Sequence, residues 1–232
     1  MALTKGNSKL GGNIWVWSLR AGPDCPGKSD ACYGAGKCYA LHGHMSRPSV
    51  KAAYEFNSSI SRTSYFASWM ILELLVHKVN VCRVHVAGDF YDAEYVRKWV
   101  QIVKASPQVT FYAYTRSWRI LDALKAIQEL ADLPNMHMWY SVDKTTGWPE
   151  HVPARVRLAY MQLDDKDLPQ HHVHLVFRAK RRTIVKKIDQ AIVCPVENGI
   201  TDTTCTKCGI CWNEPKQAST SLRIPLPMLK VA

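Results

Sequence analysis

The chain has 232 residues, enough for one large α/β domain or two small ones and for a sizeable core. Its apolar fraction of 47% and charged fraction of 21% are typical of globular proteins, and no stretch approaches the roughly 18 apolar residues of a membrane span. The N-terminus lacks the layout of a signal peptide. We therefore expect a cytoplasmic protein with no membrane partner, and the net charge of +11 leaves nucleic acid open as a partner.

Six segments have the β-branched and aromatic composition of strands. The first contains Trp15 and Trp17 and ends shortly before Gly22 and Pro23. In chain order, the predicted strands cover residues 13–19, 81–86, 109–114, 136–142, 156–163 and 173–177.

Helical patterns separate the first four strands. Residues 49–79 are predicted to form one or two helices, and Asp92 is expected to cap the next one. Apolar residues from Ile120 to Leu130 recur at helical spacing, and a last helix is predicted over residues 183–190. This alternation indicates βαβ units and a parallel sheet.

We predict a single α/β domain over residues 1–232. About six strands are too few for a closed eight-stranded barrel. The expected fold is therefore a partial, TIM-barrel-like (β/α) barrel of parallel strands, with a flat doubly wound sheet as the alternative. A cysteine loop over residues 20–47 and a cysteine-rich extension over residues 192–232 complete the chain.

Polar residues follow the second, third and fourth predicted strands, at the edge where ligands of parallel sheets bind. Turn residues and helix caps end strands in the same way, which is the alternative interpretation. We expect a small-molecule ligand at the barrel mouth. Asp89, Arg116 and Asp143 are the candidates to position it, as catalytic residues if the protein is an enzyme, and Gly88, Asp89, Ser117 and Ser141 are the candidates to bind a cofactor.

The eight cysteines indicate metal or redox chemistry in a cytoplasmic chain. Cys205, Cys208 and Cys211 stand in two consecutive CxxC steps, and Cys194 is a natural fourth ligand. Close runs of this kind hold iron–sulfur clusters, whereas four thiolates also suit structural zinc. We expect a [4Fe–4S] cluster at this group, with zinc as the alternative metal.

A second group, Cys25, Cys32 and Cys38, lies in a short loop rich in glycine. Three protein ligands leave one metal position open, as catalytic metal sites do. His42 and His44 follow closely, and either is an alternative fourth ligand. This group predicts another cluster with one open iron, unless both cysteine groups share a single site.

Three weaker signals have ordinary explanations. Cys82 lies inside an apolar strand and is predicted to be a small buried hydrophobe. The basic segment 178–187 could hold nucleic-acid phosphates, or it could be a solvated helix start. His171, His172 and His174 lack nearby ligand residues and are interpreted as surface histidines.

The plan resembles that of radical S-adenosylmethionine enzymes. Those enzymes have a partial (β/α) barrel, a three-cysteine loop after the first strand and a Gly-rich motif after the second. Here the matching features are the N-terminal cysteines and residues 87–90 (AGDF), but the cysteine spacing is Cx6Cx5C and the family's is CxxxCxxC. The resemblance implies an open-site cluster that binds S-adenosylmethionine, with the C-terminal cluster as an auxiliary.

Several motifs also resemble the gene-product-eighty-eight type of phage- and plasmid-borne iron–sulfur protein. This resemblance implies cluster binding and a viral or mobile-element origin, hence the cytoplasm of a bacterial host, and it implies no particular reaction. The alternatives to an enzyme are an electron-transfer protein with a redox partner and a nucleic-acid-binding protein. The matching stretches, in order, are residues 17–27 (WSLRAGPDCPG), 38–40 (CYA), 85–90 (HVAGDF) with Trp99, 111–117 (FYAYTRS) and 205–212 (CTKCGICW).

Overall fold

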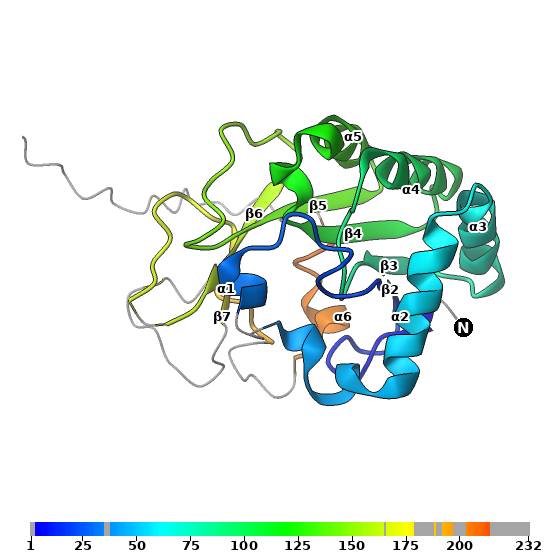
Figure 1. Ribbon diagram of the computed structural model, residues 1–232, viewed down its shortest axis with the longest axis horizontal. Helices are drawn as coiled ribbons and strands as arrows, with labels where there is room; N and C mark the ends of the chain where they lie inside the picture. Colours follow the sequence, from blue (N-terminus) through cyan, green and yellow to red (C-terminus); the bar gives the residue numbers. More distant parts are fainter. Residues whose placement is uncertain are drawn as a thin grey trace, which may run out of the picture.

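The computed structural model describes residues 3–34, 38–164, 166–178, 188, 192–196 and 203–213. Its strands form one seven-stranded sheet in the order of the chain (Figure 1). β1 runs antiparallel to β2, and β2 through β7 are all parallel. The strands are β1 (Thr4–Lys5), β2 (Ile14–Trp17), β3 (Val81–Val84), β4 (Thr110–Thr115), β5 (Met136–Val142), β6 (Arg157–Gln162) and β7 (Leu175–Arg178).

The prediction of an α/β fold with six parallel strands is confirmed, since each predicted strand overlaps one of β2 to β7. The doubly wound alternative is wrong, because the strand order never reverses. In the described part of the chain no strand joins β1 to β7, so the sheet is open. Beyond β7, Val193 forms a single parallel bridge with Val176.

Helices connect the first strands, as the sequence pattern predicts. Asp92 caps α4 by accepting a hydrogen bond from the backbone N–H of Tyr95 at 2.8 Å. The predicted helix over residues 183–190 lies outside the described residues, Ile188 apart. Among the helices that the structure describes, none has the length and apolar character needed to cross a membrane. The helices are α1 (Asp30–Tyr33), α2 (Pro48–Ser61), α3 (Phe66–Val76), α4 (Ala93–Ala105), α5 (Leu121–Ala131) and α6 (Cys205–Cys208), with 3-10 turns η2 (Tyr39–Leu41), η3 (Gly43–Ser46) and η4 (Ser117–Arg119).

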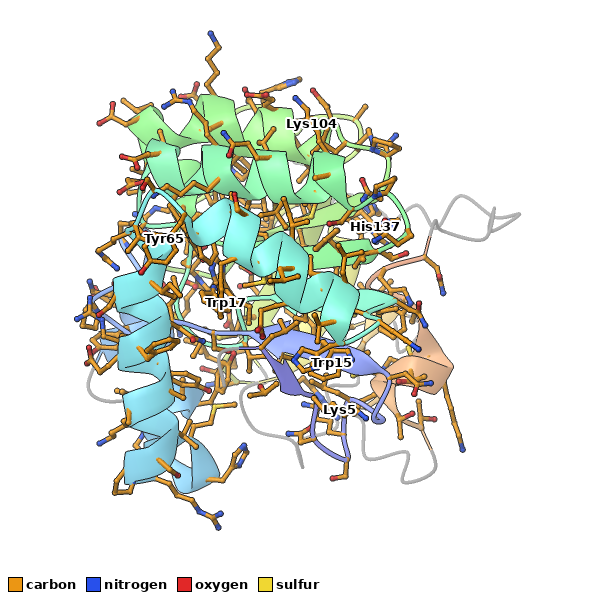
Figure 2. All side chains as sticks on the ribbon, turned by 90° about the vertical axis from the view of Figure 1, so that its right-hand side faces the viewer. Lys5, Trp15, Trp17, Tyr65, Lys104 and His137 are labelled. Carbon is orange, nitrogen blue, oxygen red and sulfur yellow. The ribbon has the colours of Figure 1, made fainter. Side chains whose placement is uncertain are left out.

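The main core lies between the sheet and helices α3, α4 and α5, which pack along one face (Figure 1). Right-handed connections between consecutive parallel strands place the connecting helices α3, α4 and α5 on that face. Trp17, whose indole N–H donates to the Tyr95 hydroxyl at 2.9 Å, is fully buried beneath the helices (Figure 2). Lys104 projects from the outer side of the helix layer (Figure 2).

The opposite face of the sheet, called the open face below, carries no long helix in the described residues. Its strand residues Ile14 and Tyr112 pack instead against Trp212, just after α6. Backbone N–H groups of Cys205 and Thr206 donate to carbonyl oxygens of the N-terminal segment, at 3.0 and 3.1 Å. The segment that carries the C-terminal cysteines therefore covers this face, opposite α3 to α5 (Figure 1, orange).

Candidate functional site

The N-terminal cysteine loop is anchored at the C-terminal edge of the sheet by Ser29. Its hydroxyl donates to Asp143 Oδ2 at 2.7 Å and accepts from the backbone N–H of Cys32 at 3.1 Å, which caps α1. A Cβ on Gly27 would lie 2.2 Å from the carbonyl oxygen of Arg116, so the loop passes directly over β4's end. Glycine permits this close approach, which fixes the loop over the ends of β4 and β5.

A buried carboxylate fixes the start of the same loop. Asp24 accepts hydrogen bonds from Arg20 at 2.8 and 3.0 Å and from Arg62, just after α2, at 2.9 Å. Burial acts to raise the pKa of Asp24, but hydrogen bonds from Arg20, Ser58 and Arg62 outweigh burial and lower the pKa to about 2. The Asp24 carbonyl oxygen also accepts from the Asp89 N–H at 2.8 Å, which ties the loop to the end of β3.

All three N-terminal cysteines line one cavity of about 100 Å³, called the sulfur cavity below. Cys38 is buried, and Cys25 and Cys32 are partly exposed. The cavity lies at the carboxyl ends of the central strands, where the sequence predicts a ligand site. Its lining includes the predicted residues Gly88, Asp89, Arg116 and Ser141, together with Tyr39, Arg83, His85 and Tyr114.

The thiols of the sulfur cavity interact electrostatically. Burial raises the pKa of Cys25 to about 12, and the nearby Asp89, Cys32 and Cys38 add to the rise. Burial also raises the pKa of Cys32. The Cys25 and Cys32 thiols are neutral at pH 7 in the protein alone, and a bound metal cation would displace their protons.

Asp89, Arg116 and Asp143 belong to one hydrogen-bonded network. Asp89 accepts from Thr115 Oγ1 at 2.6 Å and from the Arg116 backbone N–H at 2.8 Å, yet burial still raises its pKa. The Arg116 guanidinium donates through Nε and Nη2 to Asp143 Oδ2, both at 3.2 Å. Both carboxylates are therefore engaged by the protein itself, and they hold Arg116 at the cavity.

Asp143 is fully buried at the end of β5. Besides Arg116 and Ser29, it accepts from Thr145 and from the backbone N–H of Thr146 at 2.8 and 3.0 Å. Burial acts to raise the pKa of Asp143. The hydrogen bond from Ser29 and the charge of Arg116 are the largest opposing effects, and the pKa is lowered overall. Asp143 thus joins the cysteine loop to β4 and β5 as a charged centre.

The structure places Ser117 outside the described lining of the sulfur cavity. It begins the η4 turn and is fully buried, and it is absent from the residues that line the sulfur cavity in the described chain. Its backbone N–H donates to Thr115 Oγ1 at 2.9 Å, while its own Oγ has no hydrogen-bond partner among the described residues. The turn directs Ser117 inward.

A larger cavity of about 670 Å³, called the basin below, adjoins the sulfur cavity. The two share six lining residues, among them Arg83, Tyr114, Arg116 and Ser141. The candidate fourth ligands His42 and His44 line the basin and not the sulfur cavity, as far as the described residues go. The basin also includes Lys9, Arg178, Met161 and Phe177.

The C-terminal cysteines lie against the open face of the sheet. Cys211 Sγ accepts a hydrogen bond from the Tyr114 hydroxyl at 2.9 Å. Its carbonyl oxygen accepts from Trp139 Nε1 at 2.9 Å and from Arg157 at 3.1 Å. Gly209, with φ +70°, provides the left-handed turn that ends α6 and returns the chain toward the sheet.

Within this group, too, the thiols influence one another. Burial raises the pKa of Cys211 to about 12, and Cys194 and Cys205 contribute to the rise. Cys194 reaches the group from beyond β7, where its backbone N–H donates to the Val176 carbonyl oxygen at 2.9 Å. Cys208 is the last residue of α6, one turn after Cys205.

The described residues contain no three histidine, cysteine, aspartate or glutamate side chains grouped tightly enough for a single metal ion. Cys82 is fully buried in the main core, as predicted, and burial raises its pKa to about 12. His171, His172 and His174 are exposed, also as predicted. The basic segment 178–187 lies outside the described residues except for Arg178.

Sequence patterns did not predict several residues of the sulfur cavity, among them Arg83, His85 and Tyr114. Strand alternation contains a signal for Arg83, because Cys82 and Val84 face the helices and an arginine between them must face the other side. No such signal exists for His85, which adopts φ +66° and lies 2.9 Å through Nε2 from the Tyr95 hydroxyl. Burial lowers the pKa of His85 to about 3, so the ring is neutral at pH 7.

The family model described as Gene product 88 matches residues 1–214. The Gene 88 protein of Mycobacterium phage L5 is 26% identical over 230 residues, which cover 91% of this chain and 88% of the relative. The Gene 88 protein of Mycobacterium phage D29 is 25% identical, over 92% of this chain and 89% of the relative. No solved structure matches the chain. This chain belongs to the Gene product 88 family, which has members in mycobacteriophages.

Proposed function

We propose that the chain is an iron–sulfur protein whose principal cluster is held by Cys25, Cys32 and Cys38. The observation that carries the proposal is the convergence of these three cysteines on one cavity at the ligand-binding edge of a parallel sheet. The donor set fits, because thiolates are the ligands that iron–sulfur clusters take. Three thiols leave one iron open toward any ligand in the basin.

A second cluster is proposed for the C-terminal group, with Cys194, Cys205, Cys208 and Cys211 as ligands. The burial of Cys194 and the adjacent Trp212 would shield it from water. The effect of Cys194 and Cys205 on the pKa of Cys211 supports a common site. Four protein ligands close the coordination, which suits structure or electron transfer to a redox partner.

The arrangement of the thiols favours a cluster over zinc. Tetrahedral zinc requires thiolates about 3.8 Å apart, from Zn–S bonds of about 2.3 Å. A grouping suited to one ion is absent from the described residues, although the thiols in each group are near enough to shift one another's pKa. A cluster spreads its thiolates over several iron atoms and accepts wider spacing. Zinc remains the alternative metal.

The finer proposal is a radical S-adenosylmethionine-like enzyme on a partial barrel, and the consecutive strand order supports it. Asp89, Arg116 and Asp143 would then orient the substrate, acting mainly through Arg116. Two features favour a non-catalytic iron–sulfur protein instead. Gly88 has φ +80° and packs against Leu19, and the Asp89 carboxylate is already engaged by the protein. The conformation of Gly88 and the hydrogen bonds of Asp89 are thus explained without a cofactor.

The proposed location is the cytoplasm of the bacterial host, where reduced thiols persist. Nucleic-acid binding is kept as an alternative on the net charge of +11 alone. Loss of affinity with rising salt would be its signature.

The deciding experiment is iron, acid-labile sulfide and zinc content per chain after anaerobic purification. We expect about eight irons in the wild type, and about four in each of two variants. One variant carries Cys25→Ser, Cys32→Ser and Cys38→Ser, and the other carries Cys205→Ser, Cys208→Ser and Cys211→Ser. Cys82→Ala is the matched control, because Cys82 lies in the main core and should not change the iron content.

Zinc without sulfide in the wild type would eliminate the cluster. A perturbation of the reduced EPR signal by S-adenosylmethionine, lost in the N-terminal variant, would support the enzyme. If S-adenosylmethionine does not perturb the EPR signal of a fully loaded protein, the non-catalytic function is the one supported.

A further inference from the structure

We infer that the basin binds a small organic anion, with Arg83 as the charge that selects it. The inference rests on the proposed function in one respect, namely that the ligand would lie beside the N-terminal cluster. The charge of the basin itself is a property of the folded chain and can be tested with or without metal.

The basin is lined by cations and by no carboxylate. Among its described lining residues, Lys9, Arg83, Arg116 and Arg178 are basic, and none is an aspartate or glutamate. Arg116 has its countercharge in Asp143, which stands behind it. The described lining therefore presents basic side chains and no acidic one on a concave surface, where the field on an anion is focused.

Arg83 lacks such a countercharge. It is the third residue of β3 and lies on the open face, in register with Val16 of β2 and Tyr112 of β4. The structure gives its side chain no hydrogen bond or ion pair with any described residue, and its Nε is buried without a partner. Its one described ring contact is with Tyr114, 5.6 Å from the guanidinium to the ring centroid.

The ionisable groups that face Arg83 are Tyr112, Tyr39, Tyr114 and Cys211. None of these four groups is a carboxylate. A guanidinium whose buried Nε has no described hydrogen-bond partner is costly unless an anion pairs with it. Since Arg83 lines both the basin and the sulfur cavity, a ligand in the basin could reach it.

The size and the other lining residues define the rest of the ligand. A volume of about 670 Å³ lies in the range of sites that enclose small molecules, about 300–1,000 Å³. Tyr39, Tyr114 and Phe177 present aromatic rings, and Met45 and Met161 present flexible apolar side chains. The lining therefore suits a molecule with a phosphate, sulfonate or carboxylate group on a flat apolar body.

The test uses two dyes that differ in one anionic group. We expect 8-anilinonaphthalene-1-sulfonate to bind with a Kd at least about tenfold below that of uncharged N-phenyl-1-naphthylamine, followed by fluorescence titration. Arg83→Gln should raise the Kd of the sulfonate about tenfold and leave that of the uncharged dye within about twofold. Lys104→Gln is the matched control, because it removes the same charge from the outer helix layer (Figure 2).

Folding of each variant is checked by circular dichroism and thermal unfolding. If Arg83→Gln does not fold, Arg83→Lys serves instead and should keep the preference for the sulfonate. Equal binding of the two dyes to the wild type would overturn the inference, and so would a sulfonate affinity that survives Arg83→Gln.

Competition experiments distinguish a small anion from a nucleic acid as the ligand of the basin. Displacement of the sulfonate dye by pyrophosphate supports a small anion, whereas displacement by a single-stranded oligonucleotide and not by pyrophosphate overturns it. Iron content is measured on the same samples. Charge-selective binding without iron would refute the proposed cluster and support the inference about the basin. Iron without charge-selective binding would support the cluster and overturn the inference.

Discussion

The hydroxyl of Tyr114 on β4 donates a hydrogen bond to Sγ of Cys211 at 2.9 Å, across 97 positions of the chain. Tyr114 also lines the sulfur cavity, so the same residue bonds to Cys211 and borders the cavity of the N-terminal cysteines. Its ring stacks on Trp139, 5.4 Å between centroids, which holds the phenol in place. The two proposed clusters are therefore separated by an ordered aromatic side chain.

Tyr114→Phe is expected to lower the reduction potential of the C-terminal cluster. Hydrogen bonds to ligating sulfur stabilise the reduced, more negative state, and one worth about 1 kcal/mol corresponds to about 40 mV for one electron. The measurement is an EPR-monitored redox titration of a variant that lacks Cys25, Cys32 and Cys38. Tyr112→Phe is the control, and equal potentials in all three proteins would contradict the prediction.

Gly88→Ala is expected to destabilise the chain more than Gly12→Ala. Both glycines have positive φ, +80° and +71°, so each substitution carries the conformational cost of about 1 kcal/mol. A Cβ on Gly88 would also lie 2.5 Å from Leu19 Cβ, whereas a Cβ on Gly12 would meet nothing within 4 Å. Urea unfolding should show a difference of about 1–3 kcal/mol between the two variants. Equal losses of unfolding free energy would mean that the segments after β2 and β3 move apart and accommodate the added Cβ at no cost.

The sheet was predictable because its strands are buried and bounded by turn residues. Met136–Val142 was predicted to the residue, and the other five parallel strands were predicted within two residues at each end. β1 was missed, since the two residues of Thr4–Lys5 carry no alternation. In the observed order each strand pairs with the next one along the chain, and composition alone could not exclude a doubly wound sheet.

The site was predictable only as far as strand ends reveal it. Gly88, Asp89, Arg116 and Ser141 do meet at one cavity, because parallel strands bring their carboxyl ends together. Whether such a residue faces a ligand or its own neighbours depends on the turn that follows, and Ser117 turns inward. The pairing of Asp143 with Arg116 could not be foreseen, since spacing does not specify which polar groups satisfy one another.

Asp24→Asn is expected to reduce stability by about 2 kcal/mol at neutral pH, since the pKa of Asp24 is lowered from 3.8 to about 2. A lowered pKa gives stability that is present above pH 3.8 and is lost as the pH falls through 2. The difference in unfolding free energy between wild type and variant should thus be constant above about pH 5 and shrink toward pH 2. Chemical unfolding across this range measures it, and a difference independent of pH would contradict the lowered pKa.

Asp143→Asn is expected to cost about 3 kcal/mol, because it leaves Arg116 without its countercharge in a site where Asp143 is fully buried. The asparagine amide also turns a donor toward Ser29, which donates to Asp143 Oδ2 in the wild type. A double-mutant cycle with Arg116→Met isolates the pair: the combined loss should be smaller than the sum of the single losses by about 1 kcal/mol or more. Lys144→Met is the control, since its ion pair with Asp164 spans 3.8 Å between exposed groups and should matter little.

Additive losses in urea unfolding would show that Asp143 acts through the loop contacts alone. Retention of iron at the N-terminal group in Asp143→Asn would then show that these contacts are not needed to hold the three cysteines together.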